Sequence, residues 1–398
     1  MSAPLAGLTV LDFGHTVMGP SCGLILADMG ADVIRVEPAS GDPTRRLKGF
    51  GTGYFGFFNR NKRSIAIDLK SEAGREVGQQ LVAKADILIE NFAPGAMQRM
   101  GLDWESASKI NPRLIYASLK GFLEGPYDQR LALDEVVQMM SGLAFMTGPS
   151  GRPLRAGSSV VDIGGGMFAA IAILGALRER DRTGKGALVE SALFEAAVFL
   201  MGQHLCYAAQ TEGPIPPMPE RVSAWAVYDL FDTADGKQVF IGITSDAHWQ
   251  RFCQITGRAD LAGDPGLATN NQRISERPRL MTQLRAMFAK LTQEQAIALA
   301  EEARIPFSPI ARPEDLFTDR HLAETGGLLE TTLPNGTHTR LPRLPIRIGG
   351  EGFGLTRNPP GEGADSREVL RTLGLGEDRI AALIDSGVIV QEEEVHHG

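Results

Sequence analysis

The stretch LTVLDFGHTVMGPSCGLILADMGADVIRVEP, residues 8–38, decides the fold. Leu8–Phe13 is a short apolar run that ends in a glycine-containing turn, Gly23–Met29 has a helical pattern, and Asp32–Val36 is a second apolar run. Short apolar runs bounded by turn residues are typical of buried strands. The stretch therefore predicts a β-α-β unit, whose two strands are parallel neighbours in one sheet.

The same alternation continues beyond this unit. We expect further strands and helices in the order Ser64–Leu69 (strand), Ser71–Ala83 (helix), Asp86–Glu90 (strand), Leu114–Ser118 (strand), Ile163–Arg180 (helix) and Val189–Tyr207 (helix). Strands that alternate with helices predict a mostly parallel sheet with helical cover, which is the α/β class.

The pattern changes after the proline-rich stretch Gly213–Pro219. Two strands, Trp225–Phe231 and Lys237–Ile243, are joined across Asp235-Gly236, a hairpin signal. Helices are expected at Arg279–Leu291 and Gln293–Ala303, and a helical tail at Ser366–Val388. These signals predict a separate, smaller α+β domain over residues 223–323.

Composition excludes several classes of function. The chain has 398 residues and a net charge of −8, and a nucleic-acid partner would favour a basic surface instead. Three scattered cysteines and the absence of an HExxH pattern predict neither disulfides nor a metal site. The first seven residues show no signal peptide, and the longest apolar run, Met167–Leu177, is too short to span a bilayer. We therefore expect a cytoplasmic protein without a membrane partner.

Asp162 is the most informative single residue. It follows Val160-Val161 and precedes three glycines, Gly164–Gly166, at the expected start of a helix. Helix amides and the helix dipole stabilise an ionised carboxylate there, and such a carboxylate is a usable nucleophile toward an activated acyl group. The N–H groups of Gly164 and Gly165 are candidates for holding an oxyanion. The alternative is an aspartate that only caps the helix.

Other candidates lie near strand ends in the first third of the chain. Basic residues gather there and suit a polyphosphate or a carboxylate, although a solvated basic face is the alternative. Asn91-Phe92 combines an amide with an aromatic ring, although a simple turn explains it equally. His15 lies in the first turn, either as a ligand donor or as a structural histidine. That turn lacks the GxGxxG spacing of a dinucleotide site.

Together these segments resemble the class III CoA-transferase family, also called the CaiB/BaiF type. Six blocks carry the resemblance in order: Leu5–Asp12, Leu26–Pro38, Asn61–Ile65, Glu90–Phe92, Asn111–Ile115 and Thr183–Gly186. The resemblance implies a Rossmann-like large domain built from both chain ends, and two chains interlocked as a homodimer. It thus divides the chain into a large domain (1–200), a linker (201–222), a small domain (223–323) and a C-terminal return to the large domain (324–398).

The resemblance also implies site residues. The family's nucleophilic aspartate falls on Asp162, and His15 matches a histidine of the formyl-CoA:oxalate branch. Residues implied to bind coenzyme A as substrate, with no permanently bound cofactor, are Ile67, Lys70, Asn91, Phe92, Arg99, Lys120 and Phe122. The implied activity moves CoA from an acyl-CoA to a small carboxylic acid.

Several positions depart from the oxalate branch, which has a catalytic glutamine at Val17 and a CoA-contacting arginine at Pro38. Its glycine-rich lid has no counterpart in Thr244–Asp246. We expect a dicarboxylic acid as the acceptor, with Arg46, His15 and Lys120 as candidate partners for its second charge. Two alternatives stay open. One is a racemase, for which Leu133 replaces the histidine before Asp134, and the other is an inactive CoA-binding protein.

Overall fold

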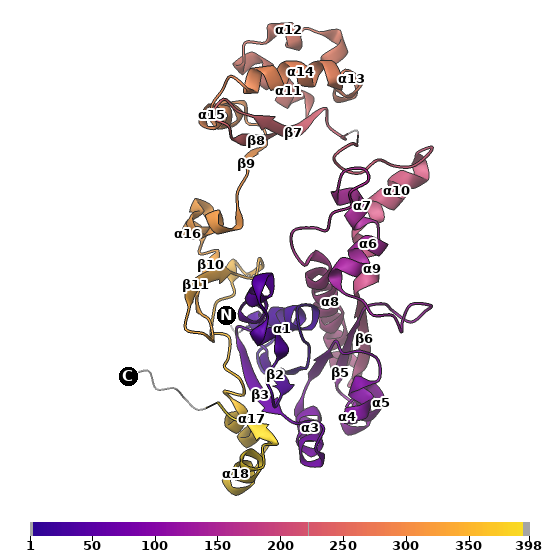
Figure 1. Cartoon of the computed structure of the whole chain (residues 1–398), viewed down its shortest axis with the longest axis vertical. Helices are drawn as coiled ribbons and strands as arrows, with labels where there is room; N and C mark the ends of the chain where they lie inside the picture. Colours follow the sequence, from indigo (N-terminus) through magenta and orange to yellow (C-terminus); the bar gives the residue numbers. More distant parts are fainter. Residues whose placement is uncertain (1–2, 222, 393–398) are drawn as a thin grey trace. The chain divides into compact units, whose positions relative to one another are not determined.

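The computed structural model describes residues 3–221 and 223–392, which fall into two compact units (Figure 1). Unit 1 comprises Met1–Pro219 and Glu324–Gly398, and unit 2 comprises Glu220–Ala323. Of the expected linker 201–222, residues 201–219 therefore belong to unit 1, where a helix occupies Gly202–Gln210.

Unit 1 is built on a seven-stranded sheet in the order β14-β3-β2-β1-β4-β5-β6. Its strands are β1 (Thr9–Asp12), β2 (Asp32–Pro38), β3 (Lys62–Ile67), β4 (Ile87–Glu90), β5 (Ile115–Lys120), β6 (Ala187–Ala192) and β14 (Ile389–Val390). Every neighbouring pair is parallel except β14 with β3. The expected α/β class with a mostly parallel sheet is confirmed.

Helices cover both faces of this sheet (Figure 1). The helices of unit 1 are α1 (Met18–Asp28), α2 (Thr52–Phe58), α3 (Glu72–Lys84), α4 (Ala96–Met100), α5 (Trp104–Ile110), α6 (Asp134–Met140), α7 (Leu143–Thr147), α8 (Val160–Thr183), α9 (Leu193–Leu200), α10 (Gly202–Gln210), α17 (Ser366–Thr372) and α18 (Glu377–Asp385), with short 3₁₀ turns η1 (Pro43–Arg46) and η2 (Gly49–Gly51). One hydrophobic core joins the sheet to α1, α6, α8 and α9, and the other joins it to α3, α4, α5, α17 and α18.

Unit 2 has its own core around Trp249, Phe252 and Phe288. The expected hairpin is present as β7 (Val227–Asp232) and β8 (Gln238–Ile243), and β9 (Phe307–Pro309) extends it. Its helices are α11 (Asp246–Ile255), α12 (Ala259–Ala262), η3 (Pro265–Leu267), α13 (Asn270–Ser275), α14 (Arg277–Phe288), α15 (Gln293–Ala303) and η4 (Pro313–Thr318). Helix α16 (Arg320–Thr325) spans the boundary at which the chain returns to unit 1. Unit 1 then continues with β10 (Leu328–Thr332), β11 (His338–Pro342), β12 (Arg347–Ile348) and β13 (Glu351–Gly352).

Two sequence predictions were wrong. Val189–Tyr207 is not one helix, because its first residues belong to β6, which pairs in parallel with β5, and the rest divides into α9 and α10 at Met201. The tail Ser366–Val388 is two helices separated at Gly374, which has a left-handed φ of +91°. In both places long-range pairing and a local glycine outweigh the helical pattern.

Helix α8 contains the apolar run Met167–Leu177. Among the described residues it is the one helix whose length and composition would allow it to cross a membrane. It packs against α1 and the sheet through Val161, Ala169 and Ile173. Its opposite side leaves Met167 and Ile171 exposed, so α8 is a core helix on one side and an open apolar surface on the other.

Candidate active site

The strand order places a reversal between β1 and β4. From β1 the chain first builds β2 and β3 on one side of the sheet, and then returns to build β4, β5 and β6 on the other. Ligands of open parallel sheets bind outside the carboxyl ends of the strands at such a reversal. The loops that begin there are residues 13–17 after β1 and residues 91–95 after β4. The first holds His15, and the second holds Asn91 and Phe92.

These two loops are locked to each other. The backbone N–H of His15 donates to Asn91 Oδ1 at 2.7 Å, and Asn91 Nδ2 donates to the His15 carbonyl at 3.0 Å. The His15 ring stacks on Phe92, with 5.4 Å between ring centres. A methyl group on Gly14 would lie 2.7 Å from the Cα of Gly19, so only glycine permits this approach.

Buried charges anchor the loop after β1. Asp12 accepts from Lys62 Nζ at 2.7 Å and from the backbone N–H of Gly14 at 2.9 Å. Arg35 donates to the carbonyls of Asp12 and Gly14. All three charged side chains are almost completely inaccessible to solvent. Their buried hydrogen bonds therefore fix the backbone of the loop that carries His15.

The His15 side chain has an unused nitrogen. Its Nδ1 is buried and has no hydrogen-bond partner among the described residues. Burial first, and then the charge of Arg35, lower the pKa of His15. A neutral imidazole with one free nitrogen can exchange a hydrogen bond with a ligand at this edge of the sheet.

Lys120 has a different environment from the one expected of a CoA-binding residue. Its Nζ donates to both carboxylate oxygens of Glu90, at 2.6 and 2.8 Å, and to the Phe92 carbonyl at 3.0 Å. Glu90 also accepts from the Phe92 N–H at 2.9 Å. An ammonium has three N–H donors, and here each has a protein acceptor. In this arrangement Lys120 fixes the loop that carries Phe92, and sequence reasoning missed its partner Glu90.

The remaining predicted CoA contacts divide into two groups. Lys70 follows β3 and Arg99 lies in α4; both are exposed and have no ion-pair or side-chain hydrogen-bond partner in the described part of the chain, which suits phosphate binding. Ile67 is buried at the end of β3. Phe122 is buried too and packs its ring against Tyr127 and Phe194. Its role in CoA binding stays a prediction.

Asp162 lies in the first turn of α8, which begins at Val160, so it is not the capping residue. The cap is supplied by Asp134 of α6, whose Oδ2 accepts from the N–H groups of Val161 at 2.9 Å and Asp162 at 3.1 Å. Gln138 donates to the other oxygen of Asp134. Asp134 lies far away in the sequence, so no local pattern marked it.

The charge state of Asp162 differs from the expectation that the helix holds it ionised. Burial, and next the neighbouring Asp134, raise the pKa of Asp162 to about 7, while the charge of Arg155 acts in the opposite direction. Two carboxylates close together in a poorly hydrated place favour the neutral form of one of them. Asp162 is therefore a carboxyl group that titrates near neutral pH.

The glycines after Asp162 serve packing. Gly164 and Gly165 are helical, so their N–H groups point back along α8 to carbonyls four residues earlier. This is at odds with the expectation that they hold an oxyanion. A methyl group on Gly165 would lie 2.5 Å from Met18 Cε, and one on Gly166 would lie 2.0 Å from Ser21 Oγ. Glycine therefore lets α8 approach α1 closely.

That close approach brings Asp162 to the loop after β1. Met18, which touches Gly165, begins α1 just after His15. Ile163, next to Asp162, packs against the cluster formed by Val17, Leu24 and Phe58. The start of α8 and the loop that carries His15 and Val17 are thus neighbours. The structure brings Asp162 to the same edge of the sheet as Asn91 and Phe92.

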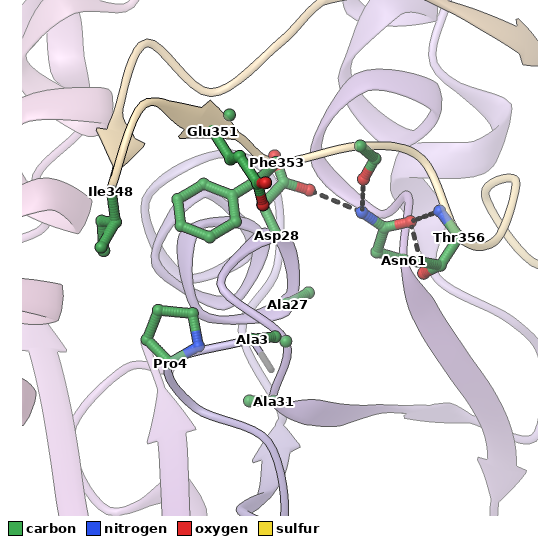
Figure 2. Close-up of a pocket in the computed structure, with 13 residues that line it drawn as sticks. Ala3, Pro4, Ala27, Asp28, Ala31, Asn61, Ile348, Glu351, Phe353 and Thr356 are labelled. Atoms are coloured by element: carbon green, nitrogen blue, oxygen red, sulfur yellow. Dashed lines mark hydrogen bonds between the residues drawn. The ribbon is translucent and has the colours of Figure 1, made fainter. Parts of the chain in front are cut away.

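A separate cavity of about 400 Å³ lies elsewhere in unit 1 (Figure 2). It is lined by the end of α1, the residues just before β2 and β3, and residues 348–356. Three of its polar residues are hydrogen-bonded to one another, because Asn61 Nδ2 donates to Asp28 at 2.8 Å and Asn61 Oδ1 accepts from the N–H of Thr356 at 2.7 Å. None of the predicted site residues lines it. Among the described residues, moreover, no cluster of His, Cys, Asp and Glu suits a metal ion.

Known proteins share both the sequence pattern and the fold of this chain. The sequence profile of CoA-transferase family III matches residues 5–366. The chain is 33% identical to a succinyl-CoA:glutarate CoA-transferase of Mus musculus, over 98% of this chain and 91% of that one. It is 35% identical to an acetyl-CoA:oxalate CoA-transferase of Acetobacter aceti, over 87% and 90% of the two chains. A crystal structure of a CaiB/BaiF family protein from Brucella suis superimposes with a TM-score of 0.81 at 32% identity, covering 94% of this chain and all of that one.

The matched profile covers most of the chain, the relatives match over nearly their whole length, and the fold is shared. The resemblance found in the six sequence blocks is thereby confirmed: the chain belongs to CoA-transferase family III.

Proposed function

We propose that this enzyme transfers CoA from an acyl-CoA to a small dicarboxylic acid, with Asp162 as the covalent nucleophile. The observation that carries the proposal is the position of Asp162. Its partly buried carboxyl group lies beside the loop that carries His15, at the edge of the sheet where ligands of this fold bind. The enzyme class follows from the family.

The proposed reaction has two symmetrical halves. A carboxylate oxygen of Asp162 attacks the thioester carbon of the donor, which forms a mixed anhydride and releases the CoA thiolate. The thiolate then attacks the aspartyl carbonyl, giving an aspartyl-CoA thioester and the free donor acid. The acceptor carboxylate attacks this thioester and the same two steps run in reverse. One thioester is exchanged for another, so no ATP is consumed.

The other residues bind and orient. In this proposal the exposed Lys70 and Arg99 contact the phosphates of CoA, as point charge and planar donor respectively. The stacked His15 and Phe92 rings form one wall, and the free Nδ1 of His15 hydrogen-bonds the thioester or carboxylate oxygen. Lys120 and Glu90 keep Phe92 in place.

A dicarboxylic acceptor is supported by two relatives, which are named for glutarate and for oxalate. Val17 is buried beside Ile163 and makes the side of the proposed site next to Asp162 apolar. We therefore favour an acid with a methylene chain over oxalate. The test is to incubate the enzyme with succinyl-CoA and a panel of acids, without ATP, and to measure new acyl-CoA by mass spectrometry. Glutarate should outperform oxalate. Faster turnover of bulky monocarboxylates than of every dicarboxylate would contradict the proposal.

The racemase alternative gains no support from the structure. A racemase needs a base on each face of the substrate α-carbon. Leu133 cannot carry a proton, and Asp134 is buried with both oxygens engaged by Gln138 and the amides of Val161 and Asp162. Transfer without exchange of the substrate's α-hydrogen is therefore expected in deuterated water.

The raised pKa of Asp162 gives a pH prediction. Only the ionised carboxylate attacks, so the rate of adduct formation should fall about tenfold per pH unit below about 7. In the variant Asp134→Asn a neutral side chain replaces one cause of the raised pKa, while its oxygen can still accept the same two amides. The acidic limb should then move to lower pH. Single-turnover rates between pH 5 and 9 measure this, and an unmoved limb would exclude Asp134 as a cause.

We infer that the chain works as an interlocked homodimer. Helices α8, α9 and α10 expose an apolar face whose members are Met167, Ile171, Phe199, Leu200, Leu205 and Tyr207, with Phe199 71% exposed. Phe168 and Phe199 join α8 to α9 edge to face at 5.2 Å. Large apolar side chains exposed on three consecutive helices in this way are typical of an interface.

We propose a cytoplasmic location. The three cysteines are free thiols, which is compatible with a reducing compartment.

Light scattering after size-exclusion chromatography should give twice the chain mass of 42.9 kDa. The double variant Ile171→Glu/Phe199→Glu places two charges in the apolar face and should therefore elute as a monomer. Phe50→Glu is the matched control, because Phe50 is 66% exposed on a different element. A wild-type monomer, or a control that dissociates equally, would contradict the assignment of this face.

A further inference from the structure

Arg155 lies in the segment between α7 and α8, seven positions before Asp162. Its Nε donates to the carbonyl of Ala156 at 3.0 Å, and one terminal nitrogen pairs with the carboxylate of Glu135. The Arg155 side chain is 33% exposed and that of Glu135 is 60% exposed. The guanidinium has five N–H donors in one plane, and these bonds use only part of them.

Arg155 and Asp162 are held by the same turn of α6. Gln138 accepts from the N–H of Ala156 at 2.9 Å, and Asp134 accepts from the N–H of Asp162 at 3.1 Å. Glu135, the partner of Arg155, lies between them on this turn. The turn therefore places a cation next to the nucleophile. The charge of Arg155 indeed lowers the pKa of Asp162, against the effects of burial and Asp134.

We propose that Arg155 binds the second carboxylate of the dicarboxylic substrate, and that Glu135 occupies the guanidinium until the substrate displaces it. The inference rests on the proposed function and adds the residue that selects diacids over monoacids. A guanidinium matches a carboxylate in two parallel hydrogen bonds. The ion pair with Glu135 shows that a carboxylate can bind to the Arg155 guanidinium in this position. Solvent-exposed ion pairs are weak, so a substrate carboxylate can replace Glu135.

The other cations considered for this role are engaged elsewhere. All three donors of Lys120 are used by Glu90 and Phe92. Arg46 donates to the carbonyl of Ser40 at 3.0 Å and lies 3.9 Å from Glu362. Burial lowers the pKa of His15, so at neutral pH its ring can hydrogen-bond a carboxylate but offers it no positive charge. Arg155 combines partial exposure with a place beside Asp162.

The test compares pairs of substrates that differ only by a carboxylate in place of a methyl group. Acceptors are glutarate and pentanoate, and donors are succinyl-CoA and butyryl-CoA. Selectivity, the ratio of kcat/KM for the diacid over the monoacid, is measured for the wild type, Arg155→Gln, Arg155→Lys and Glu135→Gln. The assay is run at pH 9, where Asp162 is ionised even without the charge of Arg155. There we expect the selectivity of Arg155→Gln for glutarate to fall at least tenfold through KM, with pentanoate changed less than threefold. Arg155→Lys should recover part of it, and Glu135→Gln should lower the KM for glutarate.

The outcomes separate the two proposals. An active Arg155→Gln enzyme with unchanged selectivity would overturn the role of Arg155 and leave the proposed function intact. An equal loss for diacid and monoacid would also overturn it, because it would show that Arg155 only supports Asp162. A wild-type enzyme that forms no new acyl-CoA from any acid would overturn the proposed function, and this inference with it.

Discussion

Replacing Asp162 with alanine is expected to lower the rate of CoA transfer at least about a thousandfold, because the covalent route loses its nucleophile. Wild-type enzyme incubated with acyl-CoA should gain the mass of a CoA adduct, which peptide mapping should locate on Asp162. The variant should gain none. The measurement is intact mass together with exchange of labelled acid into acyl-CoA.

Two controls separate lost chemistry from lost structure. Asp181→Ala changes an exposed aspartate near the other end of the same helix and should retain full activity. Asp162→Asn should melt at a higher temperature than the wild type at pH 8. The pKa of Asp162 is raised in the folded state, so the stability that it contributes below pH 4 is lost as pH rises through about 7. Full exchange activity in Asp162→Ala would refute the mechanism.

The second large effect concerns stability. Lys62→Met should cost about 3–5 kcal/mol of folding free energy, because it removes the nearer cation of the buried Asp12 carboxylate, at 2.7 Å, and leaves only Arg35, at 3.8 Å. It also removes bonds from Lys62 Nζ to the Pro20 carbonyl at 3.0 Å and to Asn59 at 3.1 Å. Guanidinium denaturation measures the loss. Hydrogen exchange of the peptide 8–38 should show that the β1–α1 loop opens first, because Lys62 and Asp12 hold it.

Two matched variants test whether the unpaired charge causes the loss of stability in Lys62→Met. Lys62→Met/Asp12→Asn removes both charges and should be less destabilised than Lys62→Met alone, because no unpaired charge stays buried. Lys185→Met changes an exposed lysine and should stay within about 0.5 kcal/mol of the wild type. If the double variant were the least stable of the three, the loss would come from packing and not from the stranded charge.

Part of the candidate site could be predicted from the sequence and part could not. Asp162, His15, Asn91 and Phe92 were marked by their places after strands or before a helix, and the structure brings them to one edge of the sheet. The roles of other residues depended on partners distant in the chain. Glu90 and Lys120 are 30 positions apart and meet only because β4 and β5 pair. Asp134 reaches Asp162 across 28 positions, and no local pattern predicts that contact.

The sequence by itself determined the β-α-β beginning, the hairpin of unit 2 and the family, because periodicity, turn residues and ordered blocks are local properties of the chain. Only the tertiary structure decided that β6 is a strand, that the glycines after Asp162 pack α8 onto α1, and that Asp162 titrates near pH 7. The physical reason is the same in each case. Strand pairing, close helix contact and the hydration of a carboxyl group depend on which atoms surround a residue, and folding brings those atoms from distant parts of the chain.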